Sequence, residues 1–276
     1  MKTIAFQGEL GAYSHEACLS ARPNCKALPC KSFEEVIRAV NNNVADLAML
    51  PVENTTYGRV ADIHRLLPES GLHIIDEVFT RVKINLLSLP GERLEDIESA
   101  EAHLVLLPQA SAFLKENNIR GIRAVDSAGA AAALKESKTK GVGVLASKLA
   151  AEIYDLQVLA ENIEDSDHNT TRFLLMSSSP DTTRRGETKM MTTFIFQVRN
   201  IPAALYKAMG GFATNGVNMT KLESYMVGGS FSATQFYADI EGHPDDNNVK
   251  LAMDELSYFT QSISILGVYP ASSKRV

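Results

Sequence analysis

The chain has 276 residues, of which 45% are hydrophobic and 22% are charged, a composition typical of a globular protein with one large or two medium domains. Its formal net charge of −6, without a block of lysines and arginines, argues against a nucleic acid or an anionic membrane as the main partner. Three cysteines, Cys18, Cys25 and Cys30, fit neither a zinc pattern nor a disulfide framework, so we expect reduced thiols. We recognise neither a signal peptide nor an apolar stretch of spanning length, which favours a cytoplasmic protein.

The N-terminal part alternates short apolar runs with helical patterns, which is typical of an α/β domain. Ser32 followed by Glu35 is a capping-box signature that predicts a helix over Phe33–Asn41. The other elements expected here are a strand at Thr3–Phe6, a turn at Gly8–Gly11, a helix at Ser14–Ala21, a strand at Ala45–Val52 and a helix at Val60–Leu67.

A strand-like stretch at Glu77–Leu89 opens a second set of elements, and the chain returns to the first set near Val158–Phe173. The elements expected between them are a strand at Leu104–Leu107, helices at Ser111–Asn117 and from Ser127, a strand at Gly141–Leu145 and a helix at Ala146–Tyr154. We therefore expect two α/β lobes with a cleft between lobe one (about 1–77 and 160–178) and lobe two (about 78–159).

A linker at 179–190, rich in Ser, Thr, Pro and charge, separates residues 1–178 from a further domain at 191–271. The order βαββαβ predicted for that domain is the ferredoxin-like arrangement. Its expected elements are strand Met191–Val198, helix Pro202–Thr214 capped by Asn200, strand Val217–Tyr225, a turn at Gly228-Gly229, strand Phe231–Glu241, helix Asp245–Thr260 and strand Ser262–Val268.

Four segments bring hydroxyl or amide groups to a helix start or a strand end: Gly8–Ser14, Glu53–Thr56 with Gly58, Asp126-Ser127, and Asn169–Arg172. Helix N-termini stabilise a carboxylate by ~0.3–1 kcal/mol per exposed end, so a cleft lined this way suits a dianion. Taken singly, Ser14 and Ser127 could be N-caps only, and the last segment could be a polar turn. Because His15 and His168 lack metal-ligand spacing and no nucleophile motif is present, we expect neither a metal site nor covalent catalysis.

Three motifs resemble the signature segments of prephenate dehydratase in order and spacing. They are Gly8-Glu-Leu-Gly11-Ala-Tyr-Ser14-His-Glu-Ala17, Pro51-Val-Glu53-Asn54-Thr-Thr56-Tyr-Gly58-Arg-Val and Asn169-Thr-Thr171-Arg172-Phe173. The resemblance implies that residues 1–178 form a two-lobed catalytic domain like that of periplasmic binding proteins. The C-terminal part resembles the ACT domain that follows the catalytic region in that family. Since no chorismate mutase segment is recognised before residue 1, the resemblance is to the monofunctional form.

The resemblance implies conversion of prephenate to phenylpyruvate with loss of carbon dioxide and water, without a cofactor. It makes Thr171 the catalytic residue, which we expect to donate a hydrogen bond to the leaving oxygen rather than to act as an acid. Glu53 is expected to be a proton donor only if it is buried and protonated. The substrate-binding residues that we assign are Ser14, Asn54, Thr55, Thr56, Ser127, Asn169, Arg172 and Phe173; the roles of the last two stay open between substrate contact and support of the loop or core.

For the ACT region, the resemblance implies feedback inhibition by L-phenylalanine in a homodimer or homotetramer. The expected effector residues are Gly211, Phe212, Ala213, Asn215, Asn218, Glu223 and Ser224. Tyr225-Met226 stands where the family motif has Arg-Pro, and the segment near Gly211 also fits an ordinary helix C-terminal turn. Two alternative functions remain: an arogenate dehydratase, which accepts an amino group in place of the keto group, and a cytosolic amino-acid-binding sensor without catalysis.

Overall fold

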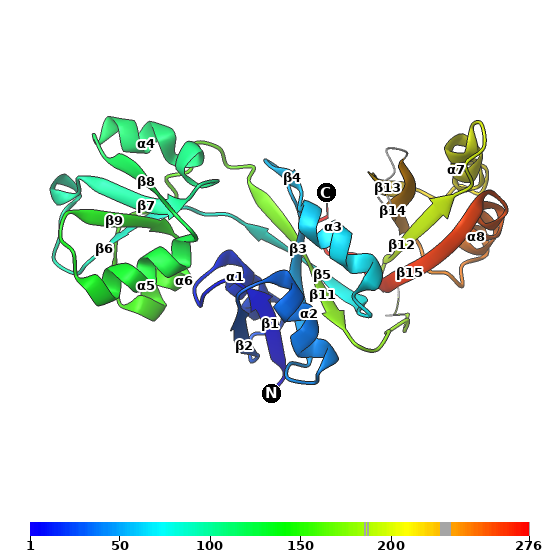
Figure 1. The fold of residues 1–276 in the computed structure, drawn as a ribbon, viewed down its shortest axis with the longest axis horizontal. Helices are drawn as coiled ribbons and strands as arrows, with labels where there is room; N and C mark the ends of the chain where they lie inside the picture. Colours follow the sequence, from blue (N-terminus) through cyan, green and yellow to red (C-terminus); the bar gives the residue numbers. More distant parts are fainter. Residues whose placement is uncertain (185, 187, 227–232, 276) are drawn as a thin grey trace. The chain divides into compact units, whose positions relative to one another are not determined.

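The computed structural model describes residues 1–184, 186, 188–226 and 233–275, and the chain divides into two compact units (Figure 1). Unit 1 comprises Met1–Val60 and Val78–Phe173, and unit 2 comprises Ala61–Glu77 and Leu174–Val276. The chain passes between the units within strands β5 (His73–Arg81) and β11 (Thr170–Ser177). Residues 61–77, which the sequence pattern placed in lobe one, thus cluster with the C-terminal part. No helix in the described ranges is long and apolar enough to cross a membrane.

The first sheet of unit 1 is built on parallel strands, with β1 (Thr3–Gln7) between β2 (Lys26–Cys30) and β3 (Leu47–Asn54). The short β4 (Gly58–Arg59) pairs antiparallel with β3. Helices α1 (Tyr13–Ala21) and α2 (Phe33–Asn41) pack against these strands. The apolar runs of β1 and β3 are buried, as expected for parallel strands covered on both faces.

The predicted cap of α2 is confirmed, because the Ser32 hydroxyl accepts a hydrogen bond from the Glu35 backbone N–H at 3.2 Å. The reciprocal half of the capping box differs, since the Glu35 carboxylate accepts the N–H of Lys31 rather than that of Ser32.

The second sheet of unit 1 has the strand order β10-β6-β9-β7-β8. Strands β7, β8 and β9 run parallel, and β6 and β10 run antiparallel to their neighbours. The alanine-rich helix α5 packs on β9, and its small side chains allow this close approach. The bounds are β6 Asn85–Ser88, β7 Ser99–His103, β8 Arg120–Ala124, β9 Val142–Ala146, β10 Gln157–Ala160, α4 Ser111–Glu116, α5 Ser127–Ser137, α6 Lys148–Tyr154, and the 3-10 turns η2 Leu94–Asp96 and η3 Leu107–Ala110.

Two sequence predictions in this region are wrong. The strand expected at Leu104–Leu107 is a turn that leads into η3, and the true strand β7 lies just before it. Pro108 favours the 3-10 turn, and Leu104 is 49% exposed, so the apolar run does not mark a buried strand. The stretch Glu77–Leu89 is two strands, β5 and β6, rather than one.

Unit 2 contains the predicted order βαββαβ (Figure 1). Its strand order is β13-β14-β12-β15, and β15 also pairs in parallel with β5 through Gly267 and Ile74. Helices α7 and α8 pack on each other beside this sheet. The bounds are β12 Met190–Val198, α7 Ala204–Thr214, β13 Met219–Met226, β14 Ala233–Glu241, α8 Asn247–Phe259, β15 Thr260–Pro270, α3 Ala61–Leu66 and the 3-10 turn η1 Leu67–Glu69.

The predicted cap of α7 by Asn200 is wrong, because the N-cap is Ala203 in a left-handed conformation with φ 60°. The predicted glycine turn at Gly228-Gly229 and the start of the strand at Phe231 lie outside the described residues.

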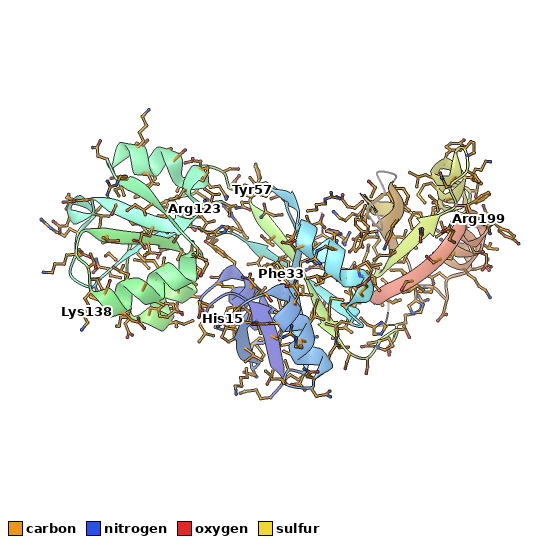
Figure 2. All side chains as sticks on the ribbon, in the orientation of Figure 1. His15, Phe33, Tyr57, Arg123, Lys138 and Arg199 are labelled. Atoms are coloured by element: carbon orange, nitrogen blue, oxygen red, sulfur yellow. The ribbon has the colours of Figure 1, made fainter. Side chains whose placement is uncertain are left out.

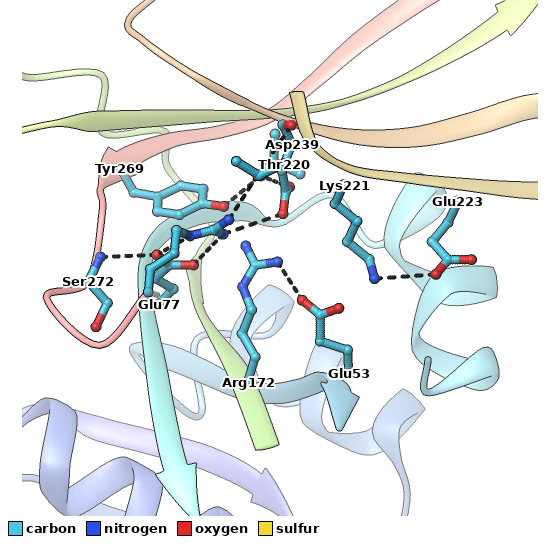
Figure 3. Close-up of polar contacts among 11 residues, drawn as sticks. Glu53, Glu77, Arg172, Thr220, Lys221, Glu223, Asp239, Tyr269 and Ser272 are labelled. Atoms are coloured by element: carbon cyan, nitrogen blue, oxygen red, sulfur yellow. Dashed lines mark hydrogen bonds and ion pairs between the residues drawn. The ribbon is translucent and has the colours of Figure 1, made fainter. Parts of the chain in front are cut away.

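A buried charged cluster joins the C-terminal tail of unit 2 to its strands (Figure 3). The Arg275 guanidinium lies 2.8 Å from a Glu77 carboxylate oxygen and 3.5 Å from one of Asp239, and both acidic side chains are fully buried. The Glu77 carboxylate also accepts the Ser272 backbone N–H at 3.0 Å. Because buried carboxylates are costly without partners, this arrangement fixes the tail against β5 and β14.

Candidate active site

The predicted catalytic threonine lies in a hydrogen-bond network between β3 and β11. The side-chain amide of Asn54, at the end of β3, donates to the Thr171 hydroxyl at 2.9 Å and to the Asn169 side-chain oxygen at 2.6 Å. Thr171 is half-buried rather than enclosed in the core, and it is the second residue of β11, not a residue before the strand as the sequence pattern suggested. Since its oxygen accepts from Asn54, its hydrogen is free to donate to another group.

Gln109 of η3 extends this network to the second sheet of unit 1. Its side-chain oxygen accepts a hydrogen bond from the Asn169 amide, and its own amide donates to the Val105 carbonyl at 2.5 Å. The Tyr57 hydroxyl donates to the same carbonyl at 2.6 Å, and Tyr57 is labelled in Figure 2. Neither Gln109 nor Tyr57 was singled out from the sequence; a lone amide between apolar residues was the one available signal for Gln109.

The Thr55 hydroxyl links the end of β3 to the start of β11 by two hydrogen bonds. Its hydroxyl accepts the Thr170 N–H at 2.9 Å and donates to the His168 carbonyl at 2.6 Å. Thr56, by contrast, is exposed, and its backbone N–H donates to the Asn54 side-chain oxygen at 2.8 Å. This local turn holds the Asn54 amide group so that its nitrogen points towards Thr171.

Arg172 and Phe173 follow Thr171 on β11, and both are buried. The Arg172 guanidinium pairs with Glu53 at 2.8 Å and is 2% exposed, as drawn in Figure 3. Phe173 is also 2% exposed and belongs to the core. This geometry favours the supporting role for both residues among those left open by the sequence. The Glu53 side chain is 30% exposed and pairs with Arg172, so the burial on which a proton-donor role depends is incomplete.

Unit 1 contains a cavity of about 240 Å³ next to this network. Its wall includes the starts of α1 and α5 with Ser14 and Ser127, and also His103 at the end of β7. Val105 lines the cavity too, and its carbonyl receives the hydrogen bonds from Gln109 and Tyr57. The cavity therefore adjoins the network through Val105, although Asn54 and Thr171 are not among the residues that line it.

The two predicted serines are not N-caps, so that alternative is wrong. The N-cap of α1 is Ala12, and the N-cap of α5 is Asp126, whose carboxylate accepts the Gly129 N–H at 2.6 Å. The Ser127 hydroxyl accepts the backbone N–H of His103 at 3.1 Å. Because that bond uses Ser127 as an acceptor, its hydrogen can be donated to a ligand in the cavity.

Burial raises the pKa of two acidic groups near the cavity. It raises the pKa of Tyr13, a lining residue, well above its usual range. Burial also raises the pKa of Glu16 on α1 to about 7, partly offset by hydrogen bonds from Leu149 and Ser147 at the start of α6. His103 accepts the Val105 N–H on its Nδ1 at 3.4 Å, so the neutral ring carries its hydrogen on Nε2. The described lining residues include no lysine or arginine, so the donors to an anion are mainly neutral groups.

Several predicted effector residues are engaged in packing within unit 2. A Cβ on Gly211 would come within 2.8 Å of the Glu255 Cβ, so glycine permits the close approach of α7 and α8. Phe212 is buried in the core, and the Asn215 amide donates to the Gly211 carbonyl at 2.8 Å and to Glu255 at 2.9 Å. Glu223 on β13 pairs with Lys221 at 3.3 Å. Ala213 is the penultimate residue of α7, and Ser224 lies on β13. Asn218 precedes β13, and its carbonyl accepts the Glu241 N–H.

Comparisons with known proteins identify relatives over the whole chain. A bifunctional N-acyl-homoserine lactone acylase/prephenate dehydratase of Komagataeibacter europaeus is 50% identical over 274 residues, covering 99% of this chain and 98% of the relative. Arogenate dehydratase/prephenate dehydratase 1, chloroplastic, of Arabidopsis thaliana is 37% identical, covering 97% and 71%.

A crystal structure of prephenate dehydratase from Arthrobacter aurescens in complex with L-Phe superposes with a TM-score of 0.89 at 27% identity, covering 99% of this chain and 91% of that one. Residues 4–181 match the family described as prephenate dehydratase. With about two thirds of its length matched in this way and a relative at 50% identity over nearly its full length, the chain belongs to the prephenate dehydratase family.

Proposed function

We propose that this chain converts prephenate to phenylpyruvate, carbon dioxide and water in L-phenylalanine biosynthesis. The observation that carries the proposal is the family match over residues 4–181 together with the Asn54–Thr171 hydrogen bond, which leaves the threonine O–H able to donate. The activity is that of a hydro-lyase.

The chemistry requires few groups from the protein. The bond between the ring and its carboxylate breaks, and its electron pair enters the ring as carbon dioxide leaves. The bond between C4 and the hydroxyl breaks at the same time, and the departing oxygen takes its electron pair and a proton, supplied by a neighbouring group or a trapped water, to become water. Because aromatisation drives the reaction, the protein mainly needs to bind two carboxylates and to stabilise the negative charge that develops on the leaving oxygen.

Each predicted site residue has a role in this proposal. Thr171 donates to the leaving oxygen, and Asn54 and Asn169 orient it, with Gln109 holding Asn169. Ser14 and Ser127, at the starts of two helices, bind the carboxylates. Thr55 and Thr56 shape the turn that presents Asn54, and Arg172 and Phe173 support β11 from behind.

The proposal extends to the organisation of the chain. Residues 1–178 form the catalytic domain, whose two sheets correspond to two lobes, 179–190 form the linker and 191–271 form an ACT domain. We infer that L-phenylalanine binds this ACT domain and inhibits the enzyme, using Gly211, Phe212, Ala213, Asn215, Asn218, Glu223 and Ser224. The Arthrobacter relative solved with L-Phe supports this regulation. Assembly into a dimer or tetramer through ACT domains is part of the same proposal.

The test is product identification from prephenate by mass spectrometry, with arogenate as a second substrate. Formation of phenylpyruvate is expected. Binding of prephenate without turnover would instead favour the sensor, and phenylalanine formed from arogenate, with no product from prephenate, would favour the arogenate dehydratase.

A second activity is proposed from the Komagataeibacter relative, whose name includes N-acyl-homoserine lactone acylase and whose identity extends over nearly all of both chains. The cavity wall contains the apolar side chains of Val105, Leu106 and Val125, which could contact an acyl chain. Incubation with an N-acyl-homoserine lactone, followed by mass spectrometry for free homoserine lactone and fatty acid, tests it; an unchanged substrate would exclude this activity.

A further inference from the structure

Asp126 places a carboxylate in the cavity of unit 1. The residue lines the cavity with Ser14, His103 and Ser127, and one of its oxygens, Oδ1, caps α5 by accepting the Gly129 N–H at 2.6 Å. Among the described residues, no lysine or arginine nitrogen lies within 4 Å of this carboxylate, and its other oxygen accepts no hydrogen bond. The Asp126 carboxylate therefore caps α5 with Oδ1 and offers Oδ2 to a ligand in the cavity as a negatively charged acceptor.

The charge of the cavity wall affects the binding of prephenate and of arogenate differently. Among the described lining residues, the ionisable groups are Tyr13, which is neutral at pH 7, His103 and Asp126. Prephenate brings two carboxylates and a neutral keto group, whereas arogenate brings an ammonium in place of the keto group. A carboxylate repels the first substrate and attracts the ammonium of the second, and it can accept a charge-assisted hydrogen bond from that ammonium.

We propose that Asp126 sets the preference of this enzyme between amino-acid and keto-acid substrates by accepting the ammonium of arogenate in the cavity. This inference rests on the proposed function, since it assumes that the cavity holds the substrate. It assigns Asp126 a substrate contact in addition to its helix cap.

The structure suggests a variant that separates the two roles of Asp126. Asparagine caps helices as well as aspartate does, so Asp126→Asn keeps an acceptor for the Gly129 N–H while it removes the charge. A residue that acted only as a cap would change kcat/KM for both substrates by the same factor. A residue that contacts the ammonium would change the ratio of the two values.

The experiment compares kcat/KM for arogenate and prephenate in the full-length wild type and in Asp126→Asn. We expect the ratio of arogenate to prephenate to fall about tenfold, as a charge-assisted hydrogen bond is lost. Asp126→Ser, a second neutral cap, should shift the ratio in the same direction.

The matched control is Asp165→Asn, because Asp165 accepts the N–H groups of Ser111 and Ala112 at the start of α4 but does not line the cavity. Its ratio should equal that of the wild type. A ratio unchanged within twofold in both Asp126 variants would overturn the inference, as would an equal shift in the Asp165 control. A wild type that turns over neither substrate would instead refute the proposed function.

Discussion

Replacing Thr171 by valine removes the hydroxyl that we place against the leaving oxygen. In the ground state this hydroxyl accepts one hydrogen bond from Asn54, whose amide retains the Asn169 oxygen at 2.6 Å after the change. The loss of stability should therefore be about 0.5–1.5 kcal/mol, the usual worth of one hydrogen bond. In the transition state the lost donor faces a developing charge, where one donor contributes about 2.7–4 kcal/mol, so kcat should fall roughly 100- to 1000-fold. Thr171→Ala should also lose at least about a hundredfold.

The assay is the initial rate of phenylpyruvate formation from prephenate, with thermal unfolding followed by circular dichroism on the same samples. Thr171→Ser is the control, because it keeps the hydroxyl at nearly the same place and should retain kcat within about tenfold. A valine variant with kcat within threefold of the wild type would remove Thr171 from the mechanism. A serine variant as slow as the valine variant would show that packing, not the hydroxyl, matters.

Three further outcomes are expected. Gln109→Leu should lower kcat about tenfold and the free energy of unfolding by about 1–3 kcal/mol, because it removes the acceptor of the buried Asn169 amide. Steady-state kinetics and urea unfolding measure the two effects, and an unchanged kcat would contradict the prediction. Glu16 has a folded-state pKa of about 7 against an ordinary 4.5, so the stability that it contributes at low pH is lost as pH rises from about 4.5 to 7. In urea unfolding, the wild type should therefore lose more stability between pH 5 and pH 8 than Glu16→Gln does. An equal change in both proteins would refute this. Arg275→Met should cost about 3 kcal/mol in urea unfolding, because it takes a cation from the buried Glu77 and Asp239 carboxylates, and an unchanged midpoint would contradict that role.

Local signals in the sequence predicted most elements of the fold. The Ser32 cap and the helix over Phe33–Asn41 were correct, as was the βαββαβ order of the C-terminal part. Strand β7 was missed because its residues, Ser99–His103, are mostly small or polar, and the apolar run that follows it is a turn. Hydrophobicity marks a strand only where the strand itself carries the buried apolar side chains.

Long-range contacts could not be predicted in the same way. The grouping of residues 61–77 with the C-terminal part depends on the pairing of β5 with β15, where a side chain on Gly267 would collide with Ile74. At the site, the motifs located Asn54 and Thr171 but not Gln109, because its contact with Asn169 joins residues 60 positions apart and follows no periodic pattern. The Asp126 cap was likewise hidden beside Ser127, since either residue type can cap a helix.

The most direct measurement of where the chemistry occurs is a crystal structure of the Thr171→Val protein with prephenate bound, since the variant should bind substrate but turn it over slowly. We expect the two carboxylates near Ser14 and Ser127 at the starts of α1 and α5, and the ring hydroxyl directed towards residue 171 beside Asn54. Prephenate bound elsewhere, with this cavity containing only solvent, would contradict the assignment of the active site.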